Sequence, residues 1–180
     1  MALRPGKCYS TVKRPYTRVS KHKPRKSYVK GVPFAKIRSF ESGKAKAEYS
    51  VKAFLVTKAA VQIRHNALES ARIAANKALE SKIGVGLYFM KVRVFPHHVL
   101  SDNPIATGAG ADRYQTGMRL SFGRPHATAA QVRASQKVIE VRVAPGKEDV
   151  AKRALKVASS KIPVPCSIVF EKAAPDVAGL

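Results

Sequence analysis

The chain has 180 residues, of which 45% are hydrophobic, so its length and composition suit a single domain with its own core. Its 34 Lys and Arg outnumber 11 Asp and Glu and give a formal net charge of +23, which opposes compaction unless a polyanion neutralises it. No apolar run approaches the roughly 20 residues of a membrane-spanning helix, and no secretory h-region is visible. We therefore expect a cytoplasmic chain with no membrane association and with nucleic acid, or another acidic macromolecule, as partner.

Residues 1–34 read as a basic extension. Twelve Lys and Arg and no acidic residue precede Glu41, and Tyr9, Tyr16 and Tyr28 are interleaved with them. Prolines and like charges keep such a segment from folding alone, whereas tyrosines among cations offer stacking surfaces beside phosphate contacts. We predict RNA or DNA contact here, with a solvated tail as the alternative. The candidate phosphate-binding residues are Arg4, Lys7, Lys13, Arg14, Arg18, Lys21, Lys23, Arg25, Lys26 and Lys30.

Two strands and a long helix are expected after the extension. Runs rich in β-branched and aromatic residues, 35–40 and 49–56, flank the turn-prone sequence ESGKAKAE and predict strands. Thr57 is the expected N-cap of a helix over 58–83, which Gly84 ends. The apolar positions that recur at helical spacing in this segment are Val61, Leu68, Ala71, Ala75, Leu79 and Ile83.

The remaining sequence predicts three more strands and a second helix. Alternating residues indicate strands over 86–95 and 137–143, and the apolar run 166–170 indicates a last one. Pro145 and Gly146 turn the chain into a helix of about 13 residues. The residues expected on the buried face of this helix are Val150, Ala154, Val157 and Ala158.

These elements define an α+β fold, with two helices packed on a mixed or antiparallel sheet. They divide the chain into the extension, a single domain over 35–172 and a C-terminal tail over 173–180. A loop over about 99–127 is far longer than the usual connection of about 4–6 residues, so we expect it to be functional or a flexible surface excursion. Its glycines permit close approach of a nucleic-acid strand, and its arginines supply planar donors. They are Gly108, Gly110, Gly117, Gly123, Arg113, Arg119 and Arg124.

The sequence offers no catalytic or metal-binding constellation. A P-loop requires a lysine directly after its last glycine, and TGAGADRYQTG has none there. A dinucleotide-binding loop requires a third glycine, which GAGADR lacks. His97 and His98 are adjacent and point to opposite faces of a strand, and His126 is isolated. Cys8 and Cys166 form neither a metal-binding pair nor a disulfide framework. We therefore expect no enzymatic activity, no catalytic or metal-ligating residue, no cofactor and no small-molecule substrate.

Four stretches together closely resemble a known family: GAGADRYQTGMRLSFGRP, LESARIAANKAL, RPGKCYSTVKRPYTR and GVPFAKIRSF. They resemble the archaeal and eukaryotic large-subunit ribosomal protein family called ten-e, the counterpart of bacterial large-subunit protein sixteen, from about Arg4 to Lys172. The combination of AGADR, QTGMR and FGRP is specific, whereas one glycine-rich piece is weak. The resemblance implies a structural protein of the cytoplasmic large ribosomal subunit with a hammerhead-like α+β domain.

The resemblance also implies partners and a role for the loop. Family members sit on large-subunit ribosomal RNA near the central protuberance and 5S ribosomal RNA, among neighbouring ribosomal proteins. Their loop points toward the peptidyl transferase centre and the acceptor arm of transfer RNA, and supports transfer-RNA placement and late subunit maturation. The residues assigned to this loop are Ala109, Gly110, Ala111, Asp112, Arg113, Gln115, Thr116, Gly117, Met118, Arg119 and Arg124.

Within the loop, Arg113 and Arg119 are the expected RNA contacts. Asp112 is expected to brace an arginine or the loop backbone, because a bare carboxylate is repelled by RNA. Pro104 stands where relatives often carry lysine, so we expect no direct electrostatic contact at that position.

Two other classes of protein share some of these features. A DNA- or RNA-packaging architectural protein would carry a similar charge, but it would bind duplex DNA comparably well. An RNA-processing enzyme would require a catalytic constellation, for which His97, His98 and His126 are the candidates.

Overall fold

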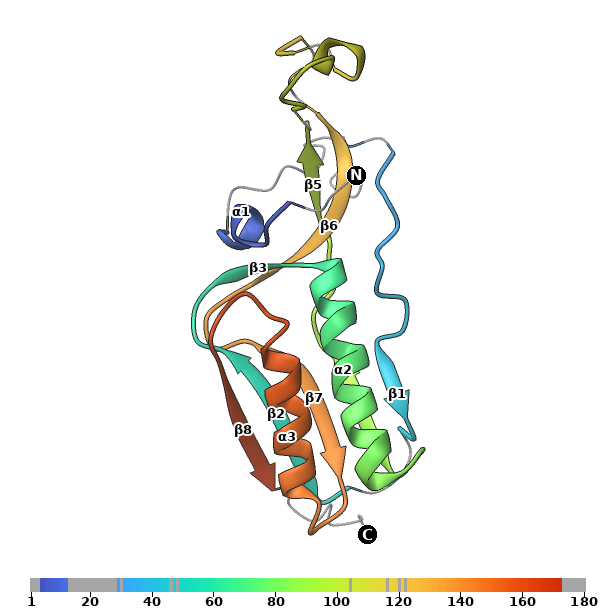
Figure 1. The fold of residues 1–180 in the computed structure, drawn as a ribbon. Coiled ribbons are helices and arrows are strands. Elements are labelled where there is room, and N and C mark those ends of the chain that lie inside the picture. Colours follow the sequence, from blue (N-terminus) through green and yellow to red (C-terminus); the bar gives the residue numbers. More distant parts are fainter. Residues whose placement is uncertain are drawn as a thin grey trace, which may run out of the picture.

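The computed structural model of the chain describes residues 4–12, 29, 31–45, 47, 49–103, 105–115, 117–119, 121 and 123–172. Its strands form two antiparallel sheets, one with the order β1-β4-β7-β2-β8 and one with the order β3-β6-β5 (Figure 1). The helices are α1 (Lys7–Ser10), α2 (His65–Ile83) and α3 (Glu148–Ser159). The strands are β1 (Glu41–Gly43), β2 (Val51–Thr57), β3 (Val61–Arg64), β4 (Tyr88–Val92), β5 (His98–Asp102), β6 (Arg124–Val132), β7 (Lys137–Val143) and β8 (Cys166–Lys172).

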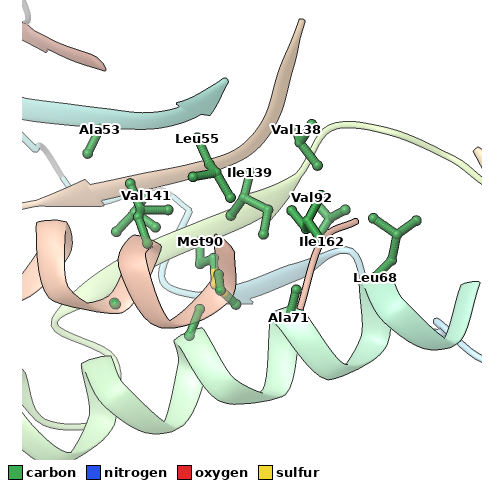
Figure 2. Packing of buried hydrophobic residues seen from close by; sticks show 14 of the residues in the cluster. Ala53, Leu55, Leu68, Ala71, Met90, Val92, Val138, Ile139, Val141 and Ile162 are labelled. Carbon is green, nitrogen blue, oxygen red and sulfur yellow. The ribbon is translucent and has the colours of Figure 1, made fainter. Parts of the chain in front are cut away.

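The main core lies between the five-stranded sheet and the helices α2 and α3, which run side by side across one face of that sheet (Figure 1). Figure 2 shows Leu55, Ile139 and Met90 between the sheet and α2, which contributes Leu68 and Ala71. Alternation along the strands directs these side chains to one face, and the helical period directs those of α2 back toward them. The α+β class and the packing of helices on an antiparallel sheet are confirmed.

Small side chains line the inner faces of both helices. Ala71 and Ala75 of α2 and Ala151, Ala154 and Ala158 of α3 are fully buried. The separation of packed helices depends on the side chains at their contact, so alanine at these positions lets α2, α3 and the sheet approach closely. These five alanines therefore lie where the two helices pack.

The opposite face of the larger sheet is covered by cationic side chains over aromatic rings. Phe54 is only 3% exposed, with the Lys137 ammonium 3.9 Å and the Arg93 guanidinium 5.9 Å from its ring centroid. The buried Glu140 carboxylate accepts hydrogen bonds from Arg93 Nη1 at 3.0 Å and from Arg142 Nε at 2.6 Å. Paired charges and cation–π contacts allow a buried ring and a buried carboxylate to lie on this face.

The smaller sheet forms an arm that extends beyond α2 and α3 (Figure 1). β6 pairs with β3 from Val61↔Val132 to Arg64↔Ala129, and with β5 from His98↔Ala129 to Asp102↔Arg124. α2 follows β3 directly, so the arm is anchored to the main core through the start of that helix. The connection between β5 and β6 lies at the far tip of the arm, away from the main core.

Several predicted elements agree with the structure. The strands over 49–56, 86–95, 137–143 and 166–170 correspond to β2, β4, β7 and β8, although β4 is shorter and β8 ends two residues later than expected. Gly84 is the C-cap of α2, with φ of 99° and its N–H donating to the carbonyl of Glu80. A left-handed φ at a helix end favours glycine, so the predicted stop is confirmed.

Other predictions are wrong in their boundaries. Residues 35–40 are not a strand, and the neighbouring pairing is instead made by β1, inside the segment expected to turn. Thr57 does not cap a helix: it ends β2, and its hydroxyl donates to the carbonyl of Arg133. α2 begins at His65 rather than at Lys58, because β3 pairs with β6 over the first part of the predicted helix.

The predicted 99–127 loop is too long at both ends. β5 occupies 98–102 and β6 begins at Arg124, so the connection covers 103–123. Val157 was expected on the buried face of α3 but is exposed, and Leu155 takes that place.

Candidate nucleic-acid interface

The first described residues are fastened to the arm. Arg4 Nη2 lies 2.9 Å from a carboxylate oxygen of Asp102 and donates to the carbonyl of Asn103 at 3.2 Å. Arg64 Nη1 donates to the carbonyl of Arg4 at 3.1 Å, and its guanidinium lies 5.3 Å from the ring centroid of Tyr9. The first described residues therefore lie next to β3 and β5, beside the start of α2.

Only part of the basic extension falls within the described residues. Lys7 lies exposed in α1, and Arg4 is partly exposed although Asp102 pairs with it. The expected phosphate contact of Arg4 would thus compete with a protein carboxylate. The other predicted phosphate-binding residues lie outside the described part of the chain, namely Lys13, Arg14, Arg18, Lys21, Lys23, Arg25, Lys26 and Lys30.

The connection at the tip of the arm has internal order in its described residues. The Gln115 side chain bridges the backbone of Ala106: its Nε2 donates to the carbonyl at 2.9 Å, and its Oε1 accepts from the N–H at 3.0 Å. A single 3-10 turn covers Ala111–Arg113, preceded by Gly110 with φ of 77°. Gln115 therefore shapes the loop, a structural role that the sequence alone did not reveal.

The side chains at the tip point outward. Ala109, Asp112, Arg113, Met118 and Arg119 are all exposed. Tyr114 is 85% exposed in the same turn. Thr116 and Pro104, which the sequence placed in this loop, lie outside the described residues. The predicted loop residues that are described thus come together at one end of the molecule, with cationic and large side chains accessible.

Glycines of the loop have two different roles. Around Gly117, with φ of 60°, and around Gly108 a Cβ atom would meet nothing within 4 Å, so space is open there for a partner. At Gly123, with φ of 78°, a Cβ would lie 2.6 Å from the carbonyl oxygen of Asp102 and 2.9 Å from the Asn103 nitrogen. The chain itself makes a close approach at Gly123, so this glycine has a structural reason in addition to the role that the sequence predicted.

His97 and His98 have different surroundings, as the sequence indicated, whereas His126 lies near His65. His97 is exposed and its ring packs at a tilt against Phe95, with 4.4 Å between ring centroids, whereas His98 is buried in β5. His65 Nδ1 lies 2.9 Å from the Thr128 hydroxyl, and burial lowers the pKa of both His65 and His98. Within the described ranges, no three His, Cys, Asp or Glu residues gather as metal ligands would.

The cysteines have unlike surroundings. Cys8 is exposed in α1 and Cys166 is half-buried at the start of β8. Burial raises the pKa of the Cys166 thiol, which disfavours the reactive thiolate. In the part of the chain that the structure describes, no helix is long and apolar enough to cross a membrane.

These features describe a strongly basic α+β protein whose arm exposes arginine and tyrosine side chains at its tip. Residues 14–169 match the family described as Ribosomal protein L16p/L10e, and the chain belongs to that family. It is therefore a structural protein of the large ribosomal subunit in the cytoplasm and not an enzyme. The resemblance drawn from its sequence motifs is confirmed.

Archaeal relatives cover almost the whole chain. The chain is 48% identical over 176 residues to the Large ribosomal subunit protein uL16 of Staphylothermus marinus, and the aligned residues cover 97% of each chain. It is 47% identical over 173 residues to the protein of the same name in Methanococcus maripaludis, across 96% of both. The corresponding protein of Archaeoglobus fulgidus is 43% identical over 172 residues, covering 96% of this chain and 95% of its own.

Proposed function

We propose that the chain binds large-subunit ribosomal RNA, including the 5S RNA and central protuberance region, through its basic extension and the base of the arm. We propose further that the tip of the arm reaches toward the acceptor arm of transfer RNA and the peptidyl transferase centre. There it supports transfer-RNA placement and late subunit maturation. The single observation that carries this proposal is the arm, which holds the 103–123 connection clear of the main core.

The geometry of the arm favours a long reach. β5 and β6 pair along the arm with one register shift between Leu100 and Ser101, and the ion pair between Arg4 and Asp102 reinforces the arm where the connection starts. A paired two-stranded base and a tip with its own hydrogen bonds reduce the entropy that binding would cost. Arg113 and Arg119 provide planar donors there, and the exposed Tyr114 ring provides a stacking surface.

The charge of the chain supports ribosomal RNA as the principal partner. A net charge of +23 is neutralised by phosphates with release of counterions, so affinity falls steeply as salt concentration rises. A DNA-packaging role would require comparable binding to duplex DNA, which family membership disfavours.

The experiment replaces the chromosomal gene by one encoding Arg113→Ala with Arg119→Ala. The matched control is Arg133→Ala with Arg153→Ala, which removes two exposed arginines from other parts of the molecule. Sedimentation in magnesium with immunoblotting measures incorporation into large subunits. Chemical footprinting of bound transfer RNA and the translation rate measure the role of the tip.

We expect both variants to enter large subunits, while only the tip variant slows translation, alters the acceptor-arm footprint or delays subunit maturation. Unchanged translation, maturation and footprint in the tip variant would refute the role of the loop. A wild-type protein that stays at the top of the gradient, or follows DNA, would refute the ribosomal RNA partner.

A further inference from the structure

A pocket of about 200 Å³ lies where the base of the arm meets the start of α2. Its apolar lining includes Leu100 of β5 and Ala127 of β6, which pack together with Tyr9 in a small cluster separate from the main core. Engineered cavities of about 150 Å³ bind a benzene ring, so this pocket is large enough for an aromatic ring system.

The charged lining of the pocket is cationic. Lys36 and Arg64 contribute its charges, His65 and His126 add imidazole rings, and no acidic residue is among its described lining residues. The pKa of His65 is lowered, first by burial and then by repulsion from Lys36, His126 and Arg64. The lowered pKa keeps His65 in its uncharged form, whereas Lys36 and Arg64 remain cationic with no acidic residue in the described lining, and this favours a ligand that carries negative charge.

An exposed aromatic side chain stands at the rim. Phe34 is 95% exposed, while the neighbouring residues Ala35 and Ile37 pack against the main core. This alternation keeps Phe34 and Lys36 on the outer side of the segment, and both contribute to the pocket lining. An exposed phenylalanine next to cations is typical of surfaces that stack nucleic-acid bases.

We propose that this pocket binds one unpaired nucleotide of ribosomal RNA. The base enters between Tyr9 and Phe34, above Leu100 and Ala127, and the phosphate is held by the cationic side chains at the rim. This inference rests on the proposed function, and it names the kind of RNA element that the base of the arm recognises: a base outside a helix rather than duplex backbone. Protein recognition of RNA commonly uses such splayed bases, because paired bases in an A-form helix are inaccessible.

The test uses the full chain and transcribed large-subunit ribosomal RNA in which 4-thiouridine partly replaces uridine. Three variants alter the pocket in different ways: Ala127→Leu fills it, Phe34→Ala removes the stacking ring, and Lys36→Gln removes one cation. Their matched controls at sites outside the pocket lining are Ala134→Leu, Leu87→Ala and Lys152→Gln, all exposed. Thermal melts followed by circular dichroism establish that each variant is folded. Phe34→Ala and Lys36→Gln keep the test valid even if Ala127→Leu unfolds, because both replaced side chains are exposed.

Two readouts are compared: the dissociation constant at fixed salt, and ultraviolet crosslinks mapped to peptides that contain Tyr9 or Phe34. We expect a crosslink to a single nucleotide outside a helix, and a loss of affinity of about tenfold in the pocket variants but not in their controls. If the wild type binds tightly, the folded pocket variants bind equally well and crosslinks form only outside the pocket, the proposed binding of a nucleotide in the pocket is refuted. The proposed function would remain intact. A wild type that binds this RNA no better than duplex DNA would overturn both.

Discussion

Gly123 offers a sharp test of how the tip of the arm is attached. Replacing Gly123 by alanine forces a left-handed backbone on a residue with a Cβ, which costs about 1–2 kcal/mol. The new Cβ would also lie 2.6 Å from the carbonyl oxygen and 2.7 Å from the carbonyl carbon of Asp102. Because these are backbone atoms of β5, relief requires the strand itself to shift, and overpacking of this kind costs about a further 1–3 kcal/mol. We expect a total loss of about 2–5 kcal/mol.

The matched control is Gly117→Ala. Gly117 also has a left-handed φ, but a Cβ there would meet nothing within 4 Å, so only the strain of about 1–2 kcal/mol applies. Urea unfolding of the purified full chain measures the free energy of unfolding, and hydrogen exchange of the β5 and β6 amides locates the loss. If Gly123→Ala destabilises no more than Gly117→Ala and leaves exchange in β5 unchanged, the close approach does not fix the base of the loop.

Three further predictions concern the domain that carries the arm. Leu55→Ala should lower the free energy of unfolding by about 2–5 kcal/mol in urea titrations, since Leu55 is fully buried in the main core; an effect below about 1 kcal/mol would contradict its place there. Glu140→Ala should lower the free energy of unfolding by about 1–3 kcal/mol, which is less than for a fully buried pair because the arginine partners of Glu140 are partly exposed. The control Glu171→Ala removes an exposed carboxylate and should lower it by under about 1 kcal/mol. Equal effects of the two substitutions would count against the network. Burial lowers the pKa of His65 and His98 in the folded state, so below about pH 6.5 the unfolded chain takes up protons that the folded chain does not. Stability should therefore fall between pH 7 and pH 5, and a urea midpoint that stays constant or rises over this range would refute the assignment.

The sequence by itself determined the features that depend on composition and short-range pattern. Charge density alone marked the extension, and alternation or helical spacing identified β2, β7 and α3 nearly to their ends. Gly84 could be recognised as a stop because glycine tolerates the backbone angle that a helix end requires. The motifs of the loop identified the family, because a specific order of residues can be recognised from the sequence without a structure.

Only the tertiary structure decided the arm and what lies at its base. The residues of β3 fit a helical pattern, and they form a strand because Val132 and its neighbours, about 70 residues later, offer a pairing edge. Phe34 alternates as a strand residue would, yet it becomes an exposed part of a pocket whose other walls include residues of α1, β3, α2, β5 and β6. Gly123 is required by the backbone of Asp102, 21 residues earlier. Each of these outcomes depends on contacts between distant segments, and local propensity is too weak to set them because pairing and burial contribute more free energy than intrinsic preference does.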